Sequence, residues 1–197
     1  QYVEFPGLGL EFSFDRVAFY LPSFLGGFGI YWYGIIIAFG FALAIIYAMS
    51  RTETFGVDPD RLFDVLLVGI ITGILGARLF YVVFSDDPTI KFFSFRDGGL
   101  AIYGGIIFGI LGGLITAKIR DVKFLPALDL VSGSFLIGQS IGRWGNFINV
   151  EAFGGNTDLP WGMIGPETTR QLSENQAALE ALGMVIDPNK PVHPTFF

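Results

Sequence analysis

Long apolar stretches dominate the pattern of hydrophobic and polar positions along this 197-residue chain. In order, they span residues 30–50, 65–84, 98–117 and 124–142. The first and third carry no charge, the second carries only Arg78, and the fourth has Asp129 near its start. About 20 apolar residues suffice for a helix to cross the ~30 Å hydrocarbon core of a bilayer. We therefore predict an all-α integral membrane protein, a polytopic bundle with four transmembrane helices in this sequence.

Basic residues concentrate in two short loops between the apolar stretches: Arg51 and Arg61 in one, and Lys118, Arg120 and Lys123 in the other. Short cytoplasmic loops carry an excess of Lys and Arg, so these loops are expected inside and the amino terminus outside. The predicted organisation is an extracytoplasmic arm (1–29), a transmembrane helical core (30–155) and an extracytoplasmic head segment (156–197).

Helix-capping residues, proline and glycine predict where the helices begin and how they pack. Asp58 followed by Pro59 is typical of a helix start. Glycines at four-residue spacing predict closely packed helices: Gly69 and Gly73, and Gly105, Gly109 and Gly113. In the head segment, "ETTRQLSENQAALEALG" predicts one surface helix of about four turns that is closed by Gly183.

Composition narrows the possible functions. A hydrophobic content of 52% and a mean hydropathy of +0.58 lie far from those of soluble proteins. The net charge of −6 offers no basic surface for nucleic acid. Without cysteine there is no disulfide, thiolate metal site or cysteine nucleophile, so any thiol in the chemistry must belong to a substrate. A lone histidine, His193, predicts no metal site.

The stretch "GRWGNFINVEAFGG", residues 142–155, places polar groups at the end of the fourth apolar stretch. On a helix, Asn146 and Asn149 share one arc with two glycines, beside Arg143, while aromatic residues occupy the opposite arc. Glu151 would fall on the apolar side, so the helix is predicted to end before it. A helix that ends at the membrane surface exposes backbone donors and can line a cavity.

Arg143 and Arg78 both lie toward the outer side, which favours a phosphate ligand because guanidinium binds phosphate oxygens bidentately and stays charged. The predicted ligand is an anionic head group, most simply that of a phospholipid, with Glu151 and the two Asn holding the arginines. The alternative is that Arg143 extends to the interface while the Asn side chains join helices.

Two further motifs contain residues that could carry chemistry. Tyr103, in "DGGLAIYGG", could donate to a phosphate, accept a proton or simply pack. "GQSIG" matches the hydrolase pattern G-x-S-x-G around Ser140, but that motif requires a strand, a turn and a helix, whereas Ser140 lies inside an apolar stretch. A hydrolase is therefore not predicted.

Together with "YWYG", "GARLFYVVF", "DGGLAIYGG" and the terminal "HPT", the 142–155 stretch closely resembles the bacterial prolipoprotein diacylglyceryl transferase family. The resemblance covers nearly the whole chain, and G-R-x-G-N-F-x-N-x-E is a specific signature. It implies an inner-membrane protein with seven transmembrane helices and no cofactor. Such enzymes move the diacylglyceryl group of phosphatidylglycerol onto the lipobox cysteine of a prelipoprotein and release glycerol phosphate.

By matching position, the resemblance implies that Arg143 binds the lipid phosphate and that Tyr33, Asn146, Glu151 and Gly154 are functional. Where this chain has Tyr103 some members have His, so the general base stays open. The predicted catalytic residues are Tyr33, Tyr103, Asn146 and Glu151; the predicted phosphatidylglycerol-binding residues are Arg78, Arg143, Asn149 and Gly154. Glu151 has two interpretations, as a catalytic residue or as a clamp on Arg143.

The family's His-Pro-Ser/Thr stretch leads into a Tyr-Glu pair and further helices, whereas this sequence stops at Phe197, so we expect a fragment that is inactive alone. Two other functions use the same residues: a transporter or flippase of an anionic phospholipid, and a membrane scaffold in which the arginines only pair with acids. Release of glycerol phosphate that depends on a peptide thiol distinguishes the transferase from both.

Overall fold

The computed structural model describes residues 1–85, 91–94 and 99–194. The chain divides into two compact units, one of residues 1–44 and 136–197 and the other of residues 45–135.

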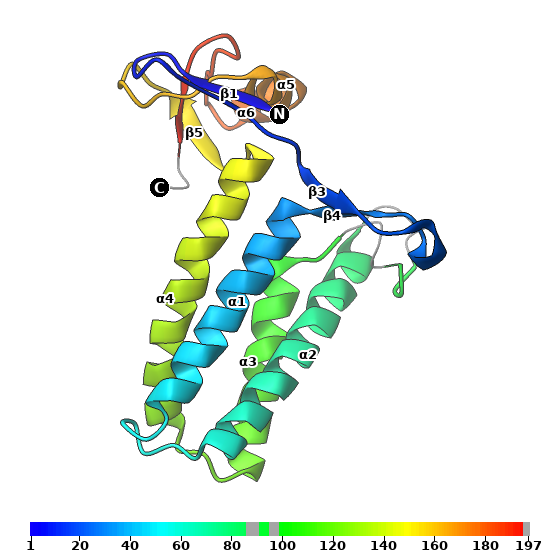
Figure 1. Ribbon diagram of the computed structural model, residues 1–197, viewed down its shortest axis with the longest axis vertical. Helices are drawn as coiled ribbons and strands as arrows, with labels where there is room; N and C mark the ends of the chain where they lie inside the picture. Colours follow the sequence, from blue (N-terminus) through cyan, green and yellow to red (C-terminus); the bar gives the residue numbers. More distant parts are fainter. Residues whose placement is uncertain (86–90, 95–98, 195–197) are drawn as a thin grey trace. The chain divides into compact units, whose positions relative to one another are not determined.

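The described residues contain four long helices: α1 (Trp32–Arg51), α2 (Pro59–Phe84), α3 (Ile102–Ile119) and α4 (Phe124–Asn149) (Figure 1). Each is long and apolar enough to cross a membrane. This confirms an all-α polytopic membrane protein. Helix α4 continues to Asn149, beyond the predicted membrane span, which ends near Gly142. Phe147 on the added turns packs against Phe5, Phe12 and Phe14, so contacts with the amino-terminal strands cover this end of α4.

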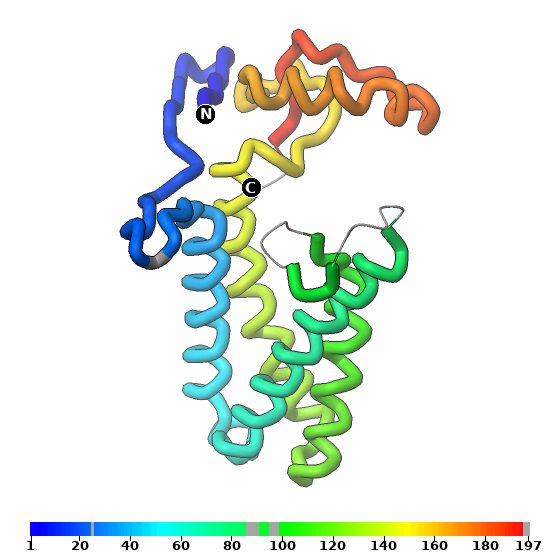
Figure 2. Tube along the Cα trace, turned by 90° about the vertical axis from the view of Figure 1, so that its right-hand side faces the viewer, coloured from blue at the N-terminus to red at the C-terminus, as the bar shows by residue number. Residues whose placement is uncertain are grey.

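In the 45–135 unit, α2 and α3 pack side by side along their lengths (Figures 1 and 2). A Cβ atom placed on Gly73 would lie 3.3 Å from the Gly105 carbonyl oxygen and 3.6 Å from Gly109 Cα. The predicted glycine ladder is therefore a site of close backbone packing. Gly76 and Gly104, which the spacing pattern did not single out, extend it, since a side chain on either would overlap the other's backbone.

The two short basic loops meet in this unit. The start of α2 is as predicted, with the Asp58 side chain accepting from the Arg61 backbone amide at 3.0 Å and Pro59 at the first helical position. The Arg61 guanidinium donates to the Arg120 carbonyl at 3.1 Å, and Arg120 pairs with Asp64. A small apolar cluster lies beside them: Ala48, Val57, Leu62, Ala127 and Leu130.

The other unit contains short antiparallel strand pairs that hydrophobic periodicity did not predict. They are β1 (Tyr2–Phe5) with β2 (Leu10–Ser13), β3 (Val17–Tyr20) with β4 (Gly29–Tyr31), and β5 (Phe153–Asn156) with β6 (Val192–Pro194). A short 3-10 helix, η1 (Ser23–Leu25), lies between β3 and β4. Strands of three or four residues are too short to show an alternating pattern.

The predicted single surface helix is wrong: two helices replace it, α5 (Pro166–Glu174) and α6 (Gln176–Ala181). The break falls at Asn175, whose backbone leaves helical geometry (φ −102°, ψ 8°) and whose side-chain amide donates to the Gln171 carbonyl at 2.8 Å. Asn competes for backbone partners in this way and therefore favours helix ends. Gly183 follows α6 with a left-handed φ of 75°, as expected for a closing glycine.

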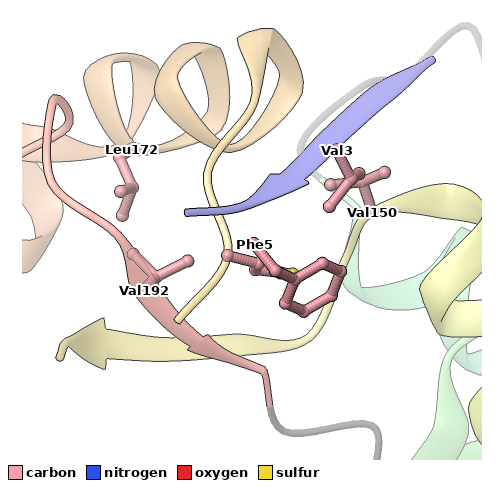
Figure 3. Close-up of a cluster of buried hydrophobic side chains, with 6 residues drawn as sticks. Val3, Phe5, Val150, Leu172 and Val192 are labelled. Atoms are coloured by element: carbon pink, nitrogen blue, oxygen red, sulfur yellow. The ribbon is translucent and has the colours of Figure 1, made fainter. Parts of the chain in front are cut away.

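Residues from both ends of the chain form the apolar core of this unit (Figure 3): Val3, Phe5, Val150, Met163, Leu172 and Val192. Val150 belongs to the 142–155 stretch and is fully buried there. Strand β1 also reaches the head segment through Glu4, whose backbone amide donates to Ile164 at 2.8 Å. The predicted arm and the predicted head segment thus share one core, which anchors the end of α4.

Candidate functional site

The site is built at the carboxyl end of α4. The helix ends at Asn149, which confirms the prediction that it stops before Glu151. The Glu151 amide donates back to the Asn146 carbonyl at 3.0 Å, while Val150 and Ala152 take left-handed φ values of 53° and 56°. Each such non-glycine residue costs on the order of 1–2 kcal/mol. We call residues 149–152 the signature turn; surrounding contacts must hold it in this shape.

Both asparagines of the stretch turn toward Glu151. The side-chain amide of Asn146 donates to Glu151 Oε1 at 2.9 Å, and that of Asn149 donates to the same oxygen at 3.4 Å. Within the described residues, Glu151 Oε2 accepts no hydrogen bond. One carboxylate oxygen is therefore fixed by amides, and the other is available to a ligand.

Arg143 lies one turn before Asn146 and is exposed. Its guanidinium makes no hydrogen bond or ion pair with any described residue, including Glu151. The interpretation of Glu151 as a clamp on Arg143 is therefore not what this structure shows. An arginine carries five N–H donors in a fixed planar fork, and here they are available to an anion.

Tyr33, on the first turn of α1, lies against Gly145. A Cβ atom placed on Gly145 would lie 2.9 Å from Tyr33 Cδ2 and 3.2 Å from Cε2. Glycine at this position therefore lets the ring rest directly on the α4 backbone. The Tyr33 hydroxyl is also within electrostatic range of the Glu151 carboxylate. Gly154, the remaining predicted position of this group, is half-buried in β5.

Arg78 and Tyr103 belong to the 45–135 unit. Arg78 is buried, with 1% of its surface exposed. Its Cζ atom lies over the Tyr81 ring, 5.6 Å from the ring centroid. Among the described residues, its guanidinium donates at 2.7–2.9 Å to the backbone carbonyls of Lys91, Phe92, Ser94 and Gly99. Arg78 thus ties residues 91–94 and Gly99 to α2, and its role in phosphate binding stays a prediction.

Tyr103 stands on the first turn of α3 and is 73% exposed. No described residue hydrogen-bonds its hydroxyl. The beginning of "DGGLAIYGG", Asp97 and Gly98, lies outside the described residues, as does Thr195 of "HPT". The exposed phenol is open to a ligand.

Residues far from the signature hold the turn and were missed by the sequence analysis. Arg16 Nη2 donates to the Asn149 carbonyl at 3.1 Å and pairs with Glu167 Oε1 at 3.2 Å. Gln171 donates to the same Glu167 oxygen at 2.8 Å and to the Val150 carbonyl at 3.2 Å. Arg16 and Asn149 are 133 positions apart, so no local pattern could have joined them.

Glu167 is held in its charged form. A hydrogen bond from Arg170 lowers the pKa of this carboxyl to about 2, and the Gln171 amide and the Arg16 charge act in the same direction. Arg170 also bonds to Glu174, on the exposed side of α5, at 2.8 Å. Glu167 therefore stays an anion that can bind both donors of the turn at neutral pH.

The remaining polar candidates have structural partners. Ser140 lies inside α4 and donates to the Leu136 carbonyl at 2.8 Å, which rules out the strand and turn of a nucleophile elbow. His193 lies in β6 with its Nδ1 2.9 Å from the Pro194 carbonyl oxygen. Among the residues that the structure describes, no three His, Cys, Asp or Glu side chains group as metal ligands.

The fold and site define a multi-pass helical membrane protein with an open arginine and an amide-bound carboxylate at one helix end. The model of the family described as prolipoprotein diacylglyceryl transferase matches residues 20–197. The chain therefore belongs to this family, as the signature resemblance predicted.

Similar proteins are named phosphatidylglycerol–prolipoprotein diacylglyceryl transferase. The one from Clostridioides difficile is 44% identical over 154 residues, 76% of this chain and 60% of its own length. That from Oceanobacillus iheyensis is 42% identical over 72% of this chain and 50% of its own, and that from Finegoldia magna is 40% identical over 75% and 59%. The matched part of the chain thus spans about half to 60% of these relatives.

Proposed function

We propose that this chain forms part of an enzyme that transfers the diacylglyceryl group of phosphatidylglycerol to the thiol of a lipobox cysteine in a prelipoprotein. Family membership and the relatives' names support this proposal. The absence of cysteine from the sequence agrees with a thiol that comes from the substrate. The enzyme needs no cofactor, because the leaving group is a phosphate ester already activated for displacement.

One observation carries the proposal: an arginine without a protein partner among the described residues lies one helical turn before an asparagine that binds a carboxylate. Arg143 binds the phosphodiester of the lipid, because its donors are free and its charge is permanent. Glu151, held by Asn146 and Asn149, faces the reacting groups with Oε2. Tyr33 holds the α4 backbone between Arg143 and Asn146 through its contact with Gly145.

In the reaction, a carbon–sulfur bond forms and a carbon–oxygen bond breaks. The thiolate attacks the glycerol carbon of the diacylglyceryl group that bears the phosphate oxygen. The electron pair of the broken bond passes to that oxygen, and glycerol phosphate leaves. Arg143 stabilises the negative charge that grows on the phosphate as the bond breaks.

The thiol proton needs an acceptor, and Glu151 and Tyr103 are the two candidates. A phenol ordinarily titrates near pH 10, so it is mostly protonated at neutral pH and is a poor base. Glu151 Oε2 accepts no hydrogen bond from a described residue, and the Asn146 and Asn149 amides hold the carboxylate in place through Oε1. We assign the proton to Glu151 and the role of a hydroxyl donor to Tyr103.

We further propose that the protein lies in the bacterial inner membrane with its amino terminus, the 142–155 stretch and the head segment outside. The concentration of Lys and Arg in the 50–61 and 118–124 loops supports this orientation. Phosphatidylglycerol would then reach Arg143 from the outer leaflet, where the prelipoprotein also emerges.

The test gives the full-length enzyme in detergent phosphatidylglycerol and a lipobox peptide, then follows peptide mass and glycerol phosphate. The proposal predicts a peptide heavier by one diacylglyceryl group and an equal amount of released glycerol phosphate. A peptide with serine in place of the cysteine should give neither product. Lipid transport across vesicles without these products would instead support a transporter.

A further inference from the structure

The signature turn is strained and carries the residues that act on the substrate. Val150 and Ala152 keep left-handed backbone angles without being glycine. Such angles persist only where the surroundings hold them. Asn149 and Glu151 alternate with these residues, so any relaxation of the turn would move the Glu151 carboxylate away from Asn146.

Three linked side chains outside the signature supply donors and charge to this turn, Arg16, Glu167 and Gln171, beside a longer bond of 3.4 Å from the Gln1 amide to the Asn149 carbonyl. Arg16 and Gln171 each bind one carbonyl of the turn, those of Asn149 and Val150. The two donors share a single acceptor, Glu167 Oε1, which fixes their positions relative to each other. The cation of Arg16 also lies at the carboxyl end of α4, where the helix dipole favours positive charge.

We propose that Arg16, Glu167 and Gln171 are positioning residues that form a clamp on the signature turn and so place the Glu151 carboxylate for proton transfer. This proposal rests on the transfer reaction proposed above. Arg16 and Gln171 act through the backbone carbonyls of Asn149 and Val150, and Glu167 acts through these two donors. A shift of about 1 Å in a reacting group can cost on the order of 100-fold in rate, so the clamp affects turnover more than lipid binding.

The chain offers a matched control on the same helix. Glu174 is exposed and bonds to Nη1 of Arg170, whereas Glu167 bonds to Nε and Nη2, so Glu174 itself contacts neither the turn nor the three clamp residues. Glu174→Gln therefore removes a charge from α5 without touching the turn. The clamp variants are Arg16→Ala, Arg16→Lys, Glu167→Gln and Gln171→Met, the last of which keeps the size of the side chain and removes its donor.

The first measurement takes kcat and the KM for phosphatidylglycerol of the full-length enzyme with a lipobox peptide, at a temperature well below the melting point of every variant. The clamp predicts that Arg16→Ala, Glu167→Gln and Gln171→Met lower kcat about tenfold or more, while KM stays within threefold. Arg16→Lys should regain much of the lost kcat, and Glu174→Gln should match the wild type. An unchanged kcat, or an effect on KM alone, overturns the proposal.

The second measurement follows hydrogen exchange of the Val150 and Glu151 amides, which bond to Phe147 and Asn146. The clamp predicts exchange about tenfold faster in the three disruptive variants and unchanged exchange in Glu174→Gln. Unchanged exchange in the disruptive variants overturns the clamp whatever the activity. A wild-type enzyme that forms no thioether contradicts the proposed reaction instead, and the exchange data then still decide whether the clamp holds the turn.

Discussion

The ring of Tyr33 rests on the backbone of Gly145, so close that a Cβ atom on the glycine would lie 2.9 Å from the ring. This contact joins the first turn of α1 to the stretch that carries Arg143, Asn146 and Glu151. It explains why a glycine stands between the arginine and the asparagine of the signature: any side chain there would displace the tyrosine.

Gly145→Ala should therefore push the Tyr33 ring off α4 and lower kcat/KM about tenfold or more. The measurement is initial rate against phosphatidylglycerol concentration in the full-length enzyme. Gly34→Ala is the control, because a Cβ atom there meets nothing within 4 Å and lies on the same helix as Tyr33. If both variants kept wild-type rates, the contact would have no part in the site.

Replacement of Glu151 by Gln should abolish most turnover. The amide keeps an oxygen for Asn146 but cannot accept the thiol proton, and a general base contributes about 10²–10⁴-fold. Tyr103→Phe removes one hydroxyl donor and should cost at most about tenfold. The rates of peptide modification by the two variants show which residue accepts the proton. A larger loss of rate in Tyr103→Phe than in Glu151→Gln would contradict the assignment of the proton to Glu151.

The sequence predicted the helices well because their signal is long and local. Long apolar stretches with at most one charge identified the four spans, and Asp58 and Pro59 marked the start of α2. The spacing of Gly73, Gly105 and Gly109 indicated that the helices carrying them pack closely. The contacts of Phe147 with Phe5 and Phe14 at the end of α4 could not be predicted, because they join residues far apart in the sequence.

The candidate site was predictable only in part, for a related physical reason. The angular arrangement of residues 142–151 placed Arg143 and the asparagines, and predicted that the helix ends before Glu151. It did not show that the asparagines bind Glu151, because the turn that brings them together depends on Arg16, Glu167 and Gln171. These residues come from distant parts of the chain and carry no motif.

Acid should lower the stability of the unit of residues 1–44 and 136–197 by protonating Glu167. The pKa of this carboxyl is lowered to about 2, below its ordinary value near 4.5, so it contributes stability at pH values above about 4.5. That contribution is lost as the pH falls toward 2. The difference in melting temperature between the wild type and Glu167→Gln should be largest near neutral pH and shrink across this interval. A difference that stayed constant with pH would contradict the ion pairs of Glu167.

The orientation can be tested with single cysteines, since the chain has none of its own. Glu53 is exposed in the first basic loop and Asp158 is exposed in the head segment, so the two variants are Glu53→Cys and Asp158→Cys. In cells whose outer layers have been removed but whose cytoplasmic membrane is intact, a membrane-impermeant maleimide should label only the cysteine at position 158. The cysteine at position 53 should react after the membrane is permeabilised. The reverse pattern would place the amino terminus inside.

Binding of phosphatidylglycerol by Arg143 is the central claim, and lipid affinity tests it most directly. The measurement is the Kd of the full-length enzyme for phosphatidylglycerol in detergent, for the wild type, Arg143→Lys and Arg143→Ala. A charged hydrogen bond contributes about 1.5–3 kcal/mol, so Arg143→Ala should weaken binding about 10- to 100-fold, and Arg143→Lys by less. An Arg143→Ala enzyme with wild-type affinity and turnover would contradict the account.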